Sequence, residues 1–143
     1  MGLGVAAACV SAWLVTLTVY DIRERRLPNW LTVPGALAIL AVAAAMGRGV
    51  PALMGAIGLA GVYLVVHLVS PASMGAGDVK LAVGVGGLTG AYGLDVWALA
   101  AIVAPLLTSV WAAAAVYRRS GSAVPHGPSM CVASLAAVAP VIL

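Results

Sequence analysis

The stretch LGVAAACVSAWLVTLTVY occupies Leu3–Tyr20 and ends directly before Asp21. An apolar run of this length approaches the roughly 20 residues that a helix needs to cross the hydrocarbon part of a bilayer. It lacks a basic segment in front of it and several similar runs follow, so we interpret it as a first membrane span and not as a cleaved signal peptide. A carboxylate at the end of such a run is costly, which makes Asp21 a candidate for function.

The composition of the whole chain indicates a membrane protein. Of its 143 residues, 64% are hydrophobic and 8% are charged, whereas soluble domains carry about 25% charged residues. So few charged side chains cannot cover a surface in contact with water, and we expect the lipid bilayer to surround the chain. The net charge of +3 comes from residues that flank apolar runs, which indicates membrane topology and not nucleic-acid binding.

Five further apolar runs follow the first, and short polar or glycine-rich connections separate them. The expected spans are Leu3–Tyr20, Trp30–Met46, Ala52–Ser70, Val79–Tyr92, Val96–Tyr117 and Ser129–Leu143. The fourth is short and rich in glycine, which predicts close packing against neighbouring helices. We therefore expect an all-α polytopic membrane protein of about six transmembrane helices. Residues 1–143 would form a single transmembrane domain, with no soluble domain.

The basic residues predict how the chain is oriented in the membrane. Most of them lie in the connections after spans one, three and five, namely Arg23, Arg25, Arg26, Lys80, Arg118 and Arg119, and the opposite side holds Arg48. The positive-inside rule then places these three connections in the cytoplasm and both termini outside. Asp21 and Asp78 are separated by two spans, so both fall at the cytoplasmic face of the inner membrane.

Asp21 and Asp78 together suggest a chemistry that neither suggests alone. Taken singly, Asp21 is explained equally well as an interfacial acid paired with Arg25 or Arg26, and Asp78 as a helix N-cap. Two carboxylates that meet can instead share one proton and activate a water molecule. This predicts an aspartyl protease working at a membrane, with no metal and no cofactor, because the two carboxyl groups supply both the acid and the base.

Three motifs in this chain resemble those of the type IV prepilin peptidases. Asp21 is followed after six residues by Pro28-Asn29, and Gly75-Ala76-Gly77-Asp78-Val79-Lys80-Leu81 resembles the GxGD segment of the family with its downstream flank. Val124-Pro125-His126-Gly127-Pro128 resembles a late proline–glycine–proline segment, in which Phe is common at the place of His126. The three motifs occur in order, each at a predicted cytoplasmic connection.

The resemblance implies an intramembrane aspartyl endopeptidase. It would remove the leader peptide of prepilin, pseudopilin or preflagellin-like membrane proteins at the cytoplasmic face. By this analogy Asp21 and Asp78 are the catalytic pair, one as general base on water and the other, protonated, as donor to the scissile carbonyl. Substrate-binding or supporting roles would fall to Gly75, Gly77, Lys80, Pro28, Asn29, Pro125, Gly127 and Pro128.

The supporting roles of three of these residues, Gly75, Gly77 and Lys80, also have a physical basis. Gly75 and Gly77 lack a Cβ, so an extended substrate backbone can approach the connection before Asp78 closely. Lys80 stands two residues after Asp78. It can act on that carboxylate or on an acidic substrate residue, or it can simply extend to the membrane interface.

Larger members of the family carry an additional cytoplasmic segment with paired cysteines near the N-terminus, which is associated with N-methylation of the trimmed pilin. This sequence contains nothing of that kind and resembles the short, peptidase-only members. We therefore do not expect N-methyltransferase activity.

Two other classes of function stay open at this point. A small proton-coupled transporter or channel subunit also uses acids within the membrane, although it would favour acids in the middle of a span. A non-catalytic assembly subunit would tolerate the loss of either aspartate. The sequence leaves the particular pilin substrate and the oligomeric state open.

Overall fold

The computed structural model describes residues 2–121 and 123–142, and all regular structure in these ranges is helical. The helices are α1 (Gly2–Glu24), α2 (Asn29–Ala45), α3 (Gly49–Val69), α4 (Ala76–Gly90), α5 (Leu94–Tyr117) and α6 (Gly127–Ile142). Each corresponds to one predicted span, and the all-α fold is confirmed. The predicted end of the last span, Leu143, lies outside the described residues.

The helices differ in length and apolarity. Among the described residues, α1, α3 and α5 are long and apolar enough to cross a membrane by themselves, and α2 and α6 are shorter apolar helices. Large apolar side chains point outward along the bundle, with exposed fractions of 71% for Leu68 and 78% for Val116. Such a surface is unfavourable in water and favourable in lipid, so the helices form a membrane protein.

Both aspartates lie in helices and not in the connections where we expected them. Helix α1 continues through Asp21 to Glu24 and stops at Arg25, whose φ of 53° is left-handed. Helix α4 begins at Ala76, so Asp78 belongs to its first turn. The difference for α1 arises because charged residues such as Arg23 and Glu24 end an apolar run without opposing a helix.

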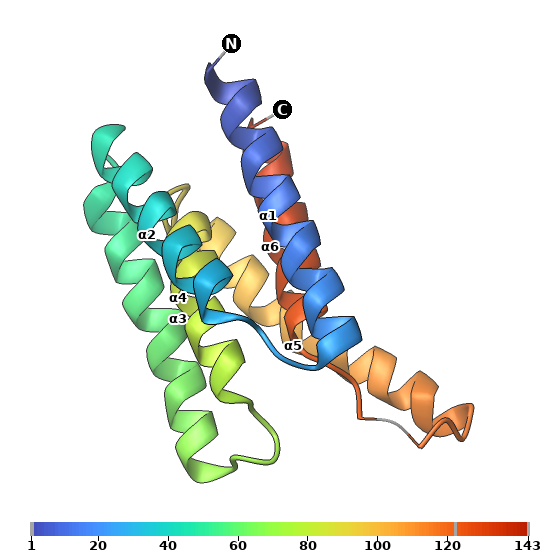
Figure 1. The fold of residues 1–143 in the computed structure, drawn as a ribbon. Helices are drawn as coiled ribbons and strands as arrows, with labels where there is room; N and C mark the ends of the chain where they lie inside the picture. Colours follow the sequence, from blue (N-terminus) through green and yellow to red (C-terminus); the bar gives the residue numbers. More distant parts are fainter. Residues whose placement is uncertain (1, 122, 143) are drawn as a thin grey trace.

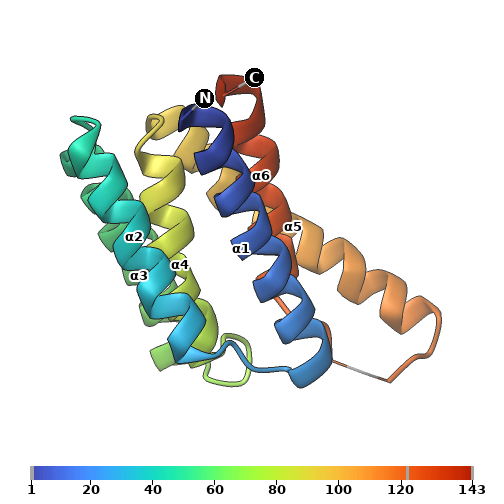
Figure 2. The same ribbon diagram turned by 45° about the horizontal axis from the view of Figure 1, so that its top comes forward.

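Helix α4 is the centre of the bundle, and α1 packs beside α6 at its edge. Helix α4 packs against α2, α3, α5 and α6, and α1 lies along α6 in both views of the ribbon (Figures 1 and 2). Helix α5 runs past the others and extends away from the bundle (Figure 1). The ends of α1 and α6 marked N and C lie at one end of the bundle. Residues 25–28, 70–75, 118–121 and 123–126 lie between helices at the opposite end (Figure 2).

Glycines bring α3 and α4 into backbone contact. A Cβ placed on Gly86 would lie 2.9 Å from the Cβ of Leu59, and one on Gly90 would lie 2.7 Å from the carbonyl oxygen of Pro51. Real Cβ atoms do not approach other atoms so closely, so these positions admit only glycine at the observed helix separation. The close packing that the glycines of α4 predicted is confirmed.

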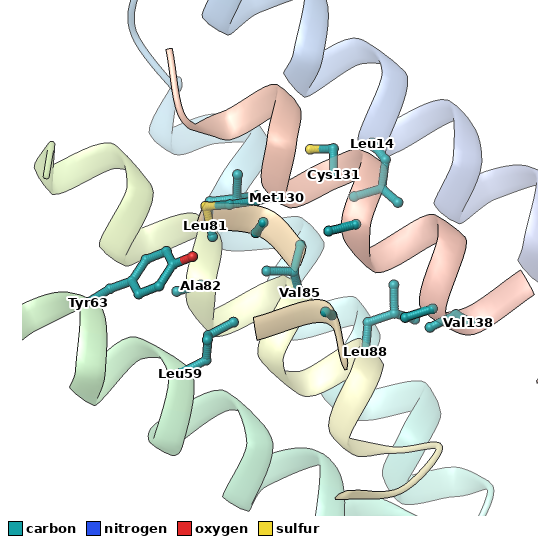
Figure 3. Close-up of a cluster of buried hydrophobic side chains, with 14 of the residues drawn as sticks. Leu14, Leu59, Tyr63, Leu81, Ala82, Val85, Leu88, Met130, Cys131 and Val138 are labelled. Carbon is teal, nitrogen blue, oxygen red and sulfur yellow. The ribbon is translucent and has the colours of Figure 1, made fainter. Parts of the chain in front are cut away.

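The apolar core lies where α1, α4 and α6 meet. Leu14 of α1, Leu81 and Val85 of α4, and Met130 of α6 are each at most 1% exposed. Figure 3 shows these side chains gathered between the helices, with Leu59 and Tyr63 of α3 closing the cluster from the other side. This core holds α1 and α6 against α4 and thereby fixes the ends of the helices that carry the two aspartates.

The charged residues are distributed unequally over the two ends of the bundle. The end formed by residues 25–28, 70–75, 118–121 and 123–126 carries Arg23, Arg25, Arg26, Lys80, Arg118 and Arg119. At the other end, the guanidinium of Arg48 lies 5.1 Å from the centre of the Tyr92 ring, a distance at which a cation and an aromatic face attract each other. The cytoplasmic location of the basic end and the external location of both termini stay predictions.

Candidate active site

Asp21 is buried at the end of α1 against the beginning of α6. Its side chain is 7% exposed, and its Oδ2 accepts a hydrogen bond of 3.0 Å from the backbone N–H of Gly127. A Cβ on Gly127 would overlap this oxygen and would lie 3.1 Å from Cγ of Asp21. Only glycine permits this contact. Burial disfavours the ionised form of this carboxyl group, and the N–H of Gly127 and the positive end of the α6 helix dipole partly offset that effect.

The interpretation of Asp21 as an interfacial acid paired with arginine is not supported. Arg25 is exposed, and its charge affects Asp21 less than the backbone N–H of Gly127 does. An exposed arginine near a carboxylate contributes little, because water screens the attraction. Asp21 is therefore held by the backbone of a helix that lies 106 positions away in the sequence.

Asp78 occupies the first turn of α4, where its side chain is partly buried. The N-cap residue of this helix is Gly75, with extended backbone angles and without a hydrogen bond from a capping side chain. The interpretation of Asp78 as the N-cap is therefore wrong. The backbone N–H of Asp78 instead donates to the carbonyl oxygen of Gly75 at 3.1 Å, and the backbone N–H of Gly75 acts on the carboxyl group of Asp78 in return.

The two glycines before Asp78 have different surroundings. A Cβ on Gly77 would lie 3.3 Å from the Cβ of Leu27, so this position makes room for the α1–α2 connection to cover the start of α4. Gly75 is exposed, and a Cβ there would lie at an ordinary 3.5 Å from Oδ2 of Asp78. The exposed side of the Asp78 turn is thus open around Gly75, whereas Gly77 belongs to the packing of the turn.

The carboxyl groups of Asp21 and Asp78 are electrostatic neighbours. The charge of Asp21 acts on Asp78, and both charges act on the buried thiol of Cys131, which lies one turn after Gly127 in α6. The first turn of α6 is thus the point around which the ends of α1 and α4 come together. Carboxyl groups whose charges act on each other titrate as a pair.

Two of the predicted supporting residues bind each other. The ammonium of Lys80 in α4 donates a hydrogen bond of 2.8 Å to Oδ1 of Asn29, the first residue of α2. Pro28 precedes Asn29 as the N-cap of α2, and its carbonyl oxygen accepts the first backbone hydrogen bonds of that helix from Leu31 and Thr32. These residues join the start of α2 to the start of α4.

The late segment begins helix α6. Pro125 comes before the helix and Pro128 is buried in its first turn, where the missing N–H of proline removes no helical hydrogen bond. His126 lies between them. Its carbonyl oxygen accepts the first hydrogen bond of α6, from the N–H of Met130 at 3.1 Å. The segment therefore positions the N–H of Gly127 that binds Asp21.

Two residues of this region, Tyr63 and Thr108, were not among the site residues predicted from the sequence. The Tyr63 hydroxyl of α3 lies 2.9 Å from Nε2 of His126, and Thr108 Oγ1 of α5 lies 2.6 Å from Nδ1. Burial lowers the pKa of His126, so its ring is neutral at neutral pH. The only signal in the sequence was a polar side chain within an apolar span, and many such residues merely bond to their own helix.

The fold and this site define a class of protein, an all-helical membrane bundle with two interacting carboxyl groups at one end. The sequence model of the type IV leader peptidase family matches residues 8–116. This is more than half of the chain, and the chain therefore belongs to the type IV leader peptidase family. The matched range includes Asp21 and Asp78 and ends before Gly127.

One curated relative covers most of the chain. The prepilin leader peptidase/N-methyltransferase of Xanthomonas campestris pv. campestris is 31% identical over 140 residues, which cover 91% of this chain. The chain spans about half of that relative, 48% of its length. No solved structure matches the chain significantly.

Proposed function

We propose that this chain is an aspartyl endopeptidase that removes the leader peptide of prepilin-like membrane proteins at the cytoplasmic face of the inner membrane. The observation that carries the proposal is the meeting of Asp21 and Asp78 at one end of the bundle, around the first turn of α6. Membership of the type IV leader peptidase family supports the reaction, and the name of the Xanthomonas relative supports the substrate class.

The surroundings of the two carboxyl groups suggest different roles for them. Asp21 is the carboxyl group whose Oδ2 accepts a 3.0 Å hydrogen bond from the first turn of α6, and we assign it as the general base that takes a proton from the attacking water. Asp78 keeps the shared proton and donates it to the carbonyl oxygen of the scissile peptide bond. When the tetrahedral intermediate collapses and the C–N bond breaks, the proton on Asp21 passes to the departing amine, and a hydroxyl of the intermediate returns a proton to Asp78 as the carbonyl re-forms.

The exposed residues beside Asp78 offer a place for the substrate backbone. Ser73 and Gly75 are exposed and lie in the α3–α4 connection directly before the turn that carries Asp78. Gly75 leaves space that a side chain would fill. An extended peptide that crosses this connection passes the carboxyl groups, while the apolar helix that follows its leader stays in the bilayer.

Replacement of each aspartate by asparagine tests the proposal. Asparagine keeps the shape of aspartate and cannot ionise, so Asp21→Asn and Asp78→Asn should each reduce cleavage by orders of magnitude. The double variant should be no less active than the single variants, because members of a catalytic unit fail together. Cleavage is measured by co-expression with a candidate prepilin, followed by N-terminal sequencing of the product.

Glu24→Gln and Asp95→Asn serve as matched controls. Glu24 is exposed at the last residue of α1, and Asp95 is exposed in the first turn of α5 at the opposite end of the bundle. Both controls should cleave normally. Each variant is first shown to insert in the membrane at the normal level. Cleavage at the normal rate by purified Asp78→Asn protein would refute the aspartyl-protease mechanism and would favour a transporter or an assembly subunit.

A further inference from the structure

His126 connects three helices to the peptide group that binds Asp21. Its Nε2 lies 2.9 Å from the Tyr63 hydroxyl of α3, and its Nδ1 lies 2.6 Å from Oγ1 of Thr108 in α5. Its ring centre is 5.5 Å from that of Tyr63. The next backbone N–H in the chain, that of Gly127, donates to Asp21. A rotation of His126 would therefore move the peptide that contacts Asp21.

The hydrogen bonds around the ring have one arrangement in which every proton has an acceptor. Thr108 Oγ1 also lies 3.2 Å from the carbonyl oxygen of Ala104, one turn earlier in α5. If the Thr108 hydroxyl donates to Ala104, its oxygen accepts the proton of Nδ1–H, and Nε2 accepts the proton of the Tyr63 hydroxyl. In the other neutral tautomer Nε2–H donates to Tyr63, and the Tyr63 proton has to find a different acceptor. The first arrangement is therefore favoured.

We propose that His126 is a positioning residue of the peptidase. Bound to Tyr63 and Thr108, its ring holds the Gly127 N–H against Asp21. It touches neither the scissile bond nor the water, and its effect on catalysis rests on the proposed function above. The hydrogen-bond arrangement itself does not depend on that function and is tested separately.

Nuclear magnetic resonance of the intact protein tests the arrangement without any substrate. The chain has 2 histidines, so protein labelled with ¹⁵N-histidine gives two pairs of ring nitrogen signals, and His67→Gln identifies the pair of His126. At neutral pH we expect a neutral ring that is protonated at Nδ1. Tyr63→Phe and Thr108→Val should each change its shifts, whereas the control Ser109→Ala should not. A ring that exchanges freely between tautomers, and that neither variant affects, would overturn the proposal.

The amide signal of Gly127 reports positioning directly. Its hydrogen bond to a carboxylate should shift the amide proton downfield, and Asp21→Asn should reduce this shift. His126→Phe fills the space of the ring without its nitrogens, so it should move the signal in the same direction, while Ser109→Ala should leave it in place. An unchanged Gly127 signal in His126→Phe would show that the ring does not hold this peptide.

Kinetics then test the catalytic consequence. In a chain that cleaves prepilin, His126→Phe should lower kcat by about tenfold or more, the loss expected when one hydrogen bond to a charged group is weakened. KM should stay nearly constant, since His126 contacts no substrate. Tyr63→Phe should add no further loss to His126→Phe, and Thr108→Ser should restore what Thr108→Val removes. A normal kcat in His126→Phe would refute the positioning role. Failure of the wild-type chain to cleave would refute the proposed function, and the two spectroscopic tests would still decide the arrangement.

Discussion

The contact between Gly127 and Asp21 gives the sharpest prediction for a residue outside the pair of aspartates. In Gly127→Ala, the new methyl group would overlap Oδ2 of Asp21. Asp21 is 7% exposed and is enclosed by α1 and α6, so it has little space into which to retreat. The substitution should therefore break the 3.0 Å hydrogen bond while keeping both carboxyl groups in the chain.

The size of the effect follows from the bond that is lost. A hydrogen bond to a charged group contributes about 1.5–3 kcal/mol. If the bond stabilises the ionised base on which the transition state depends, its loss should lower kcat by about 10- to 150-fold, at 1.36 kcal/mol for each factor of ten. The acidic limb of the rate profile should also move to higher pH, because the Asp21 anion is no longer stabilised by the N–H.

The assay is cleavage of a prepilin reconstituted with the purified variant in lipid vesicles, with initial rates measured over a range of pH. Gly61→Ala is the matched control, because a Cβ on Gly61 of α3 would meet no atom within 4 Å. It should cleave at the wild-type rate. If Gly127→Ala is folded and cleaves within about twofold of the wild type, less than the factor of ten that marks a lost charged hydrogen bond, the assignment of Asp21 as a base supported by Gly127 is wrong.

Three further predictions concern the shared proton, the orientation and the packing. Cleavage should fall at low pH, where both carboxyl groups are protonated, and at high pH, where both are ionised, so initial rates should give a bell-shaped profile; a rate that keeps rising with pH would exclude a protonated partner. The orientation is tested by cysteine labelling in a chain whose native cysteines Cys9 and Cys131 have been replaced. Arg25→Cys and Ser120→Cys should be shielded from an impermeant reagent added outside, whereas Val50→Cys, at a position that is 72% exposed, should react. Outside labelling of both Arg25→Cys and Ser120→Cys would contradict a cytoplasmic site. Gly86→Ala should reduce the free energy of unfolding in detergent by about 1–3 kcal/mol, because α3 and α4 must separate to admit the methyl group; equal stability of Gly86→Ala and Gly61→Ala would refute the backbone contact.

The helices could be predicted from the sequence because lipid imposes a simple requirement on it. A run such as Val96–Tyr117 has to satisfy its backbone internally, so apolar length alone predicts a helix. The location of Asp21 and Asp78 at the same end of the bundle was also predictable, because the two spans between them return the chain to the side from which it started. The ends of the helices were less predictable, because polar residues such as Arg23 and Glu24 suit both a connection and a final helical turn.

The partners of the candidate catalytic groups could not be predicted from local sequence. The motif that ends in Pro128 marked Gly127 as important, but nothing in it identified Asp21 as the group that requires a glycine there. For Lys80 a carboxylate, an acidic substrate residue and the membrane interface were the alternatives, and its ammonium instead donates to Asn29. Tyr63 resembles any aromatic residue in an apolar helix until the fold brings it to His126. Such contacts depend on how distant helices pack, and hydrophobic periodicity carries no information about that.

The distance of 106 positions between Asp21 and Gly127 has a consequence for the order in which the protein matures. A ribosome makes the chain from its N-terminus, so both aspartates emerge well before α6 is synthesised. Until α6 has entered the membrane and packed along α1, Asp21 lacks the N–H that stabilises its charge. The chain made before α6 thus carries both acidic residues without a complete site, and the insertion of α6 assembles it.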